Sequence, residues 1–262
     1  MRTLIKYECK RMFTSREMKL SLLVGVGVSV WFLLQYVWKK DVYQAYQFPE
    51  SLFQKWIGGD SFPVQSFLYY LLLPLIAALP GGAALYEDME NNFIANVCIR
   101  CSKGCYLAAK YIAVFLTGGI AFVFPLILNV LIAAAHFPAL IPEPISNIGP
   151  SGNFMFFELY FSHPWIYLFF FLLLAFLFAG GCASISLLAS FYVHNKAGVL
   201  LTPFAVYFGV YCINNIADRM DFSPNYFLIG GVGIENGWIL PIYEICFLVV
   251  LLLYLWKGWR YE

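Results

Sequence analysis

The sequence has little charge: Asp, Glu, Lys and Arg make up 12% of its 262 residues, whereas about 25% is usual in soluble domains. This shortage excludes an ordinary water-soluble domain, and the mean hydropathy of +0.74 agrees with that conclusion. Apolar runs of about 20 residues, enough helix to cross a hydrocarbon core of about 30 Å, recur along the chain. We therefore expect an all-α polytopic membrane protein.

Motifs of several enzyme classes are also absent. The sequence contains no G-x-x-x-x-G-K-[ST] loop for the phosphates of ATP, no H-E-x-x-H zinc motif and no G-x-S-x-G serine motif. A glycine spacing at 231–237 approaches G-x-G-x-x-G, but it follows no βαβ pattern. We expect no cofactor and no nucleic acid to bind this chain, and an intramembrane enzyme remains a minor alternative.

The seven cysteines are scattered and odd in number, which argues against a disulfide framework. Cys98, Cys101 and Cys105 have a spacing that suggests a metal site. Three thiols without a nearby fourth ligand form an incomplete zinc site, however. We expect no metal centre, and the sequence does not reveal the role of these cysteines.

Six apolar segments are long enough to cross a membrane. The second contains Pro80-Gly81-Gly82, which we expect to kink its helix. Thr14 and Glu17 fit a T-x-x-E capping box, which we expect to begin the first helix. No loop is long enough for a separate domain, so 1–262 is expected to form a single transmembrane domain. The expected spans are about 20–38, 67–86, 111–135, 165–192, 197–213 and 239–256.

The basic residues predict the orientation of these spans. If both termini, the 87–110 connection and the 193–196 turn lie on one side, that side holds twelve of the sixteen Lys and Arg residues. The other side holds Lys39, Lys40, Lys55 and Arg219. By the positive-inside rule, both termini are expected to be cytoplasmic in a multi-pass protein of a bacterial plasma membrane.

Residues 1–19 precede the first span and alternate between apolar and basic. Ile5, Cys9, Met12 and Phe13 recur at helical spacing, with basic residues on the other side. This pattern predicts an amphipathic helix in the membrane interface that contacts anionic lipids. A solvated tail with chance periodicity is the alternative. No small-residue cleavage site accompanies the first apolar run, so we expect a retained helix, not a signal peptide.

The densest cluster of acids lies between the second and third spans. Glu87, Asp88 and Glu90 precede a stripe of apolar residues between 93 and 101, which predicts a short amphipathic helix. Asn91 or Asn92 is expected to cap that helix, with the acids near the positive end of its dipole. Residues 102–104, Ser-Lys-Gly, are expected to end it. A short helix held between two spans at the membrane surface is suited to docking a cytosolic partner.

The order of these features resembles ABC-2-type exporter permeases. Acidic residues end the second span, a short amphipathic helix and a Ser-containing turn follow, and Lys110 opens the third span. The basic N-terminal helix, the six spans and an apolar outer segment before the last span are similar to that family as well. The family often has Gly-Thr after its acidic pair, and Asn91-Asn92 stands there in this chain.

This resemblance implies the transmembrane permease subunit of an ATP-binding cassette exporter. Such a subunit would move an amphipathic or hydrophobic substrate (peptide, drug-like or lipid-like) out of the cell by alternating access. ATP and Mg would bind to separate cytosolic ATPase subunits, and a second permease subunit, identical or not, would complete a dimer. The short helix would be a coupling helix, and its contacts with the ATPase would be Asp88, Glu90, Phe93, Ile94 and Arg100.

The outer segment 215–238 is expected to re-enter the membrane as two short helical pieces broken near Gly230-Gly231. With Tyr226 and Phe227 it would form an outer gate. Glu244 is the carboxylate placed plainly inside a span, and such groups usually face the bundle interior or a wet cavity. Substrate contact and structural pairing with Arg219 are both open for it. A channel-like or sensor membrane protein that docks a cytosolic partner is the alternative function.

Overall fold

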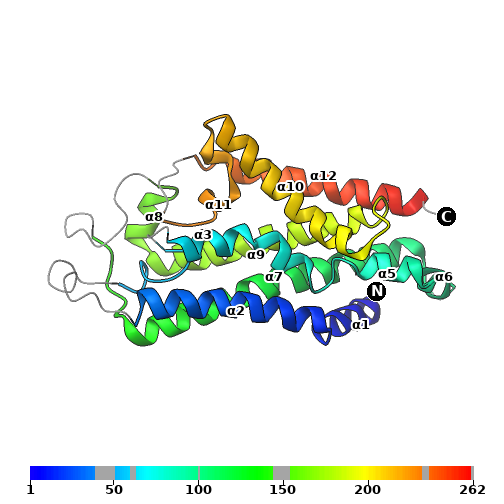
Figure 1. The fold of residues 1–262 in the computed structure, drawn as a ribbon, viewed down its shortest axis with the longest axis horizontal. Coiled ribbons are helices and arrows are strands. Elements are labelled where there is room, and N and C mark those ends of the chain that lie inside the picture. The colour runs from blue at the N-terminus through cyan, green and yellow to red at the C-terminus, as the bar shows by residue number, and fades with distance from the viewer. Residues whose placement is uncertain (39–50, 60–62, 100, 144–153, 232–235, 261–262) are drawn as a thin grey trace.

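The protein is described here from a computed structural model that covers residues 1–262 apart from 39–50, 60–62, 100, 144–153, 232–235 and 261–262. Every regular element in the described residues is a helix. The helices form an elongated bundle whose longer members run along its length (Figure 1). This part of the chain therefore has the all-α fold that its composition predicts.

Five helices are long and apolar enough to cross a membrane. Their lengths run from 21 to 34 residues, and about 20 residues suffice for a hydrocarbon core. Several such helices in one chain indicate a multi-pass membrane protein. They are α2 (Arg16–Tyr36), α7 (Lys103–His136), α9 (Pro164–Ala189), α10 (Lys196–Ile216) and α12 (Ile239–Arg260).

The expected second span, 67–86, is not one kinked helix. It consists of α3 (Val64–Leu71), α4 (Leu73–Ala78) and the beginning of α5 (Ala84–Glu90). Pro74 stands in the first turn of α4, where its missing N–H cannot continue the hydrogen bonds of α3. The second break falls at residues 79–83, which include the predicted Pro80-Gly81-Gly82 kink. Together the three pieces run along the bundle from near one end toward the other (Figure 1).

Helices α7 and α9 form the centre of the bundle, and small residues bring them together. A Cβ atom added to Gly118 of α7 would lie 2.6 Å from Cβ of Ala183 on α9 and 2.7 Å from the carbonyl oxygen of Ala77 on α4. In the most apolar stretch of α9, 61% of the residues are buried, compared with 17% in α10 and 11% in α12. Helices α10 and α12 therefore lie at the periphery.

The N-terminal helix α1 (Arg2–Phe13) packs against α7 with a face that overlaps the predicted apolar face but differs from it at two residues. Met12 is buried as expected, and Ile5 and Cys9 are half-buried, but Phe13 is exposed and Glu8 is fully buried. The apolar pattern missed Glu8 because this buried carboxylate has an ionic partner on α7. Contact between α1 and lipid remains a prediction.

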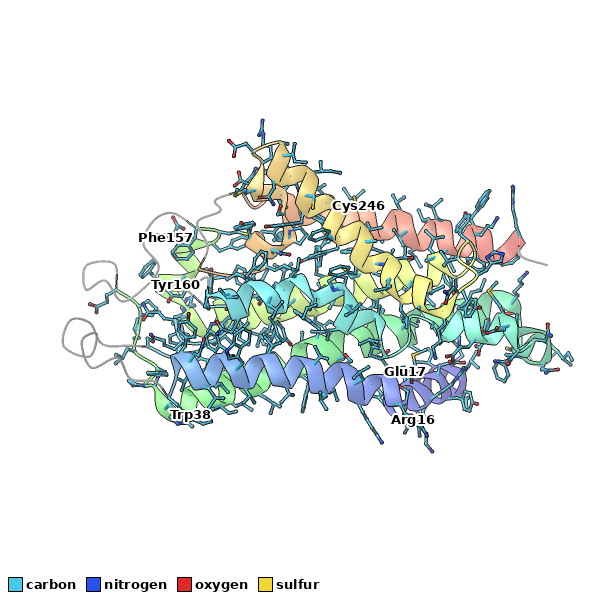
Figure 2. The ribbon with its side chains drawn as sticks, in the orientation of Figure 1. Arg16, Glu17, Trp38, Phe157, Tyr160 and Cys246 are labelled. Atoms are coloured by element: carbon cyan, nitrogen blue, oxygen red, sulfur yellow. The ribbon has the colours of Figure 1, made fainter. Side chains whose placement is uncertain are left out.

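The cap of α2 lies one residue after the predicted one. The hydroxyl oxygen of Ser15 accepts a hydrogen bond from the backbone N–H of Met18, at 3.0 Å. The hydroxyl of Thr14 instead donates to the carbonyl oxygen of Lys10, at 2.8 Å, and so closes α1. From Arg16, helix α2 runs along the bundle to the end marked by Trp38 (Figure 2).

Both chain ends lie at the same end of the bundle as the short helix α6 (Phe93–Cys98) (Figure 1). The amine of Lys103, at the start of α7, donates to the carbonyl oxygen of Trp259 near the end of α12, at 3.3 Å. At the opposite end lie α8 (Phe157–Ser162) and the close of α7, where Trp38 donates to His136 at 2.8 Å. The short elements η1 (Met220–Phe222) and α11 (Pro224–Phe227) follow α10.

Candidate functional site

A buried charge network joins α1, α5 and α7 at the α6 end of the bundle. The amine of Lys110 on α7 lies 2.7 Å from a carboxylate oxygen of Glu8 on α1. It also lies 2.5 Å from the Oδ2 atom of Asp88 on α5. The side chains of Lys110 and Glu8 are 0% exposed and that of Asp88 is 2% exposed. Three helices are thus tied by one cation that water does not reach.

Two further groups complete the shell of Asp88. The hydroxyl of Tyr106 donates to Oδ2 at 2.6 Å, and the guanidinium of Arg11 donates to Oδ1 at 2.7 Å. Tyr106 and Lys110 are four residues apart on α7, so both point to one side of that helix. Both carboxylate oxygens of Asp88 accept hydrogen bonds from side chains of the same chain. Asp88 therefore has a structural role in the interior of this protein.

The network favours the charged forms of Asp88 and Arg11. Burial alone would raise the pKa of Asp88, but the charge and hydrogen bond of Lys110, with Tyr106 and Arg11, lower that pKa below its usual value of 3.8. Burial opposes the charge of Arg11 as well, and its hydrogen bond to Asp88 together with nearby carboxylates raises the pKa of the guanidinium. Each buried acid thus has a basic side chain beside it: Lys110 for Glu8, and Lys110 and the partly exposed Arg11 for Asp88.

A more exposed set of ion pairs extends the network to α10 and α2. Lys196, the first residue of α10, lies 2.6 Å from Glu87 on α5 and 3.1 Å from Glu17 on α2. Arg11 reaches Glu87 at 3.5 Å. These side chains are a third or more exposed, so each pair contributes about 0–1 kcal/mol.

The predicted coupling residues fall into different environments. Asp88 is buried in the network, so a direct contact of its carboxylate with a partner does not fit this structure. Glu90 is exposed at the end of α5, and Phe93 and Ile94 are half-buried in α6. Arg100 lies outside the described residues. An exposed acid and two half-buried apolar side chains thus lie close together at the tip of the bundle.

The local capping of α6 differs from the prediction. Asn92 holds the N-cap position with a φ of 53°, but its side chain makes no capping hydrogen bond. The amide of Asn91 donates to the carbonyl oxygen of Glu87, at 2.8 Å, so it closes α5 instead. The acids therefore belong to the end of α5. Helix α7 begins at Lys103 with Ser102 as its N-cap residue, so the turn falls one or two residues earlier than expected.

Lys110 is the residue whose role sequence reasoning missed. We counted it among the basic residues of the membrane surface, but its side chain is fully buried. A weak signal existed, because Lys110 is preceded by Tyr106 at helical spacing and followed by a long apolar run. The partner Glu8 is 102 residues away, and no local pattern links the two.

The outer segment is packed against the bundle. Phe227, Leu228 and Ile229 are each at most 1% exposed, whereas Tyr226 is half-buried. The backbone N–H of Gly230 donates to the carbonyl oxygen of Gly58 at 3.1 Å, and Tyr167 on α9 donates to the carbonyl oxygen of Gly230. The two short helical pieces, η1 and α11, both precede Gly230. The second piece was expected after Gly230-Gly231, and residues 232–235 lie outside the described part.

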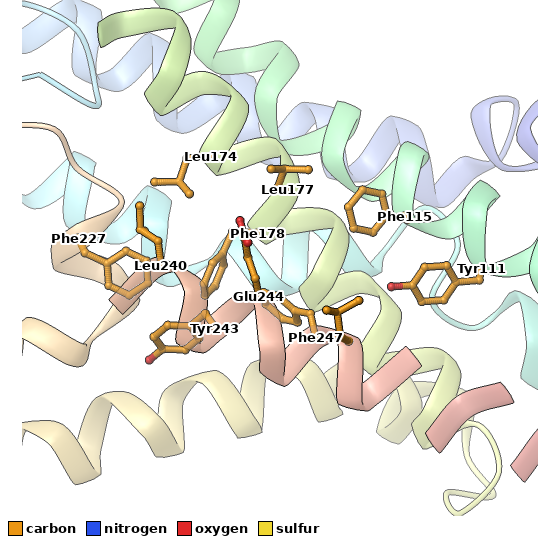
Figure 3. Close-up of a pocket in the computed structure, with 11 residues that line it drawn as sticks. Tyr111, Phe115, Leu174, Leu177, Phe178, Phe227, Leu240, Tyr243, Glu244 and Phe247 are labelled. Carbon is orange, nitrogen blue, oxygen red and sulfur yellow. The ribbon is translucent and has the colours of Figure 1, made fainter. Parts of the chain in front are cut away.

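An apolar pocket of about 250 Å³ lies between α7, α9, α11 and α12 (Figure 3). Glu244 extends from α12 into the space between α12 and α9 (Figure 3). No ion pair joins Glu244 to Arg219 or to any other described residue, so the pairing considered from the sequence is not seen there. Four leucines also line the pocket, and its aromatic lining residues are Tyr111, Phe115, Phe178, Phe227, Tyr243 and Phe247.

Within the described residues, no group of three or more His, Cys, Asp or Glu side chains could hold a metal ion. Cys101 and Cys105 are free thiols. Comparisons with known protein families, curated proteins and solved structures found no match.

Proposed function

We propose that this protein is the membrane-spanning permease subunit of an ATP-driven exporter of the ABC-2 type. Hydrolysis of ATP would occur in a separate cytosolic ATPase subunit. A second permease subunit, identical or not, would complete the export pathway. The observation that carries the proposal is the position of α6: it lies at the end of the bundle where both termini lie, next to the start of α7 (Figure 1).

The charge network supports the coupling step of this proposal. Helix α6 is linked directly to α5 on one side and to α7 on the other. Through Asp88 and Lys110, these two helices are held to each other and to α1. A push on α6 would therefore move α1, α5 and α7 as one unit, because separating them would leave buried charges unpaired.

The length of α7 supports the transmission of that movement. Its 34 residues extend about 51 Å at 1.5 Å per residue, which exceeds a hydrocarbon core of about 30 Å. Lys110 lies within two turns of the start of α7, in the part that would project from the membrane. The same helix then packs along α9 at the centre of the bundle, so its displacement would reach the outer half.

We further propose six crossings, with α3, α4 and the start of α5 forming a broken second span. Irregular backbone at membrane depth is tolerated only where protein or water covers it. This condition is met at the second break, because residues 80–83 are buried. The segment 224–230, which is buried apart from the half-buried Tyr226, would act as the outer gate, with both termini and α6 in the cytoplasm of a bacterial cell.

The experiment that tests this function measures whether an ATPase co-purifies with the chain. The chain is purified from its native membranes in mild detergent, and vanadate-sensitive ATP hydrolysis is measured in the purified material. Glu90→Lys and Phe93→Asp change the exposed acid and a half-buried apolar residue of the α6 tip. We expect either variant to lose most of the co-purifying ATPase activity while yield and thermal stability stay close to those of the wild type.

The matched control is Glu143→Lys, the same change of charge at an exposed residue that follows α7 in the chain. It should retain the ATPase activity. If Glu90→Lys and Phe93→Asp retain it as well, or if none co-purifies with the wild type, the proposed exporter function is wrong. The channel-like or sensor alternative would then stand.

A further inference from the structure

We infer that the pocket containing Glu244 binds a lipophilic cation. The first observation is chemical: the pocket wall consists of aromatic and leucine side chains, and Glu244 is its single charged group. Between Tyr111 and Trp256, the described parts of α7, α9 and α12 contain no other Asp, Glu, Lys or Arg. One negative charge on an apolar wall selects for a molecule with one positive charge and an apolar body.

The second observation is that Glu244 lacks a partner. No described basic side chain lies within ion-pair distance of it, whereas the buried acids Glu8 and Asp88 both have one. The side chain is exposed on the side of α12 that carries Ile245 and Leu248, which are 59% and 57% exposed. A carboxylate in such an apolar setting is costly unless a cation or water compensates it.

The third observation is the aromatic lining. Phe115, Phe178 and Phe247 border the pocket, and the ring centroids of Phe178 and Phe247 are 5.1 Å apart in an edge-to-face arrangement. Aromatic ring faces attract cations, and this attraction strengthens where water is excluded. A ring that turns its face to the pocket would repel an anion of equal size. The wall and Glu244 therefore select the same sign of charge.

The pocket also has access to its surroundings. Leu177 on α9 is 38% exposed, and Glu244 and Leu248 on α12 are exposed as well, so the rim opens at the surface of the bundle. Its volume of about 250 Å³ accommodates part of a drug-sized molecule, since such sites usually measure about 300–1,000 Å³. The remainder of the ligand would lie at the opening.

This inference specifies the substrate class, and the transport role of the site rests on the proposed exporter function. Binding itself does not depend on it, because the pocket lies within one chain and needs no ATPase. A purified permease without its partner is therefore the right material. Failure of cation binding would leave the exporter proposal intact, and failure of ATPase co-purification would leave the binding site intact.

The test uses two ions of nearly the same shape and opposite charge, tetraphenylphosphonium and tetraphenylborate. Binding of each is measured by equilibrium dialysis with the full chain in phosphatidylcholine nanodiscs, after subtraction of empty nanodiscs. We expect saturable binding of the cation and none of the anion. Glu244→Gln, which removes the charge and keeps the shape, should weaken cation binding about tenfold or more, equivalent to about 1.4 kcal/mol.

Two further variants make the result specific. Glu158→Gln is the same substitution at an exposed residue of α8, outside the pocket, and should leave binding unchanged. Leu240→Lys places a cation four residues before Glu244 on the pocket wall, where it can pair with the carboxylate and exclude the ligand. It should lower the affinity at least as much as Glu244→Gln. Equal binding of both ions, no saturable cation binding, or an unchanged affinity in Glu244→Gln and Leu240→Lys would overturn the inference.

Discussion

At the residue scale, the buried charges at the α6 end are the distinctive feature of this protein. Lys110, Glu8 and Asp88 are removed from water, and burial of each charge carries a desolvation penalty that good geometry must offset. The network is therefore weak evidence for extra stability. We expect it to favour one arrangement of α1, α5 and α7, because other arrangements would leave a buried charge unpaired.

Lys110→Met tests this directly. The variant leaves Glu8 with only the more distant guanidinium of Arg11, at 4.0 Å, and Asp88 with Arg11 and Tyr106, so we expect a loss of about 3–5 kcal/mol in unfolding free energy. Thermal unfolding in detergent micelles measures it. Lys196→Met, which removes a cation that is 43% exposed, should cost less than about 1 kcal/mol. Comparable losses in the two variants would contradict the assignment of Lys110 to a buried network.

The lowered pKa of Asp88 predicts a pH dependence. Its folded-state value lies below the usual 3.8, so its stabilising contribution is fully present above 3.8 and is lost as pH falls through the lowered folded value. Unfolding midpoints measured from neutral pH to below 3.8 should fall more steeply in the wild type than in Asp88→Asn. Parallel curves would show that Asp88 does not titrate differently in the folded and unfolded states.

At the element scale, close approach between helices organises the centre of the bundle. Gly118 faces Ala183 and the backbone of Ala77, so α7, α9 and α4 meet where no side chain separates them. Such contacts matter for membrane helices, which associate through tight packing because lipid is as apolar as their side chains. Helix α4 can occupy this central position because Gly118 of α7 has no side chain to hold it away.

Gly118→Ala is expected to destabilise the bundle by about 1–3 kcal/mol, since its methyl group would overlap atoms that cannot move easily. The matched control is Gly209→Ala in α10, where an added Cβ atom meets nothing within 4 Å. That change should be neutral or stabilising by up to about 1 kcal/mol, because alanine favours helix more than glycine does. Thermal unfolding of both variants in one detergent provides the comparison. Equal midpoints would mean that α7 does not approach α4 and α9 this closely.

At the scale of the whole molecule, the two ends of the bundle differ in charge. Lys103, Lys196 and Lys257 belong to the end that carries α6 and both termini, as do the basic residues of α1. The burial of Lys110 removes one surface charge from this end and leaves the asymmetry in place. The positive-inside rule thus still predicts that the α6 end is cytoplasmic.

Cysteine accessibility tests this orientation. In a background with the native cysteines replaced by serine, Ser102→Cys marks the α6 end and Glu143→Cys marks the other, and both positions are exposed. A membrane-impermeant maleimide should label position 143 in intact cells and position 102 only after permeabilisation. The reverse pattern would invert the topology and remove α6 from the reach of a cytosolic ATPase.

Much of this fold could be predicted from the sequence because lipid imposes a simple rule: a segment that crosses it must be apolar and must satisfy its own backbone hydrogen bonds. Composition and run length therefore identified α2, α7, α9, α10 and α12 to within a few residues, except where α7 extends further at its start. The short helix near residues 93–98 followed from periodicity in the same way. These are local properties.

Only the tertiary structure decided which charges are internal. The ion pair between Lys110 and Glu8 joins residues that are 102 positions apart. The hydrogen bonds of Gly230 with Gly58 and Tyr167 likewise join three separate segments. The sequence alone placed Asp88 and Lys110 at the surface because charged residues usually lie there. Asp88 and Lys110 are buried because α1, α5 and α7 place oppositely charged side chains next to each other. These side chains are far apart in the sequence, so their pairing produces no periodic pattern along the chain.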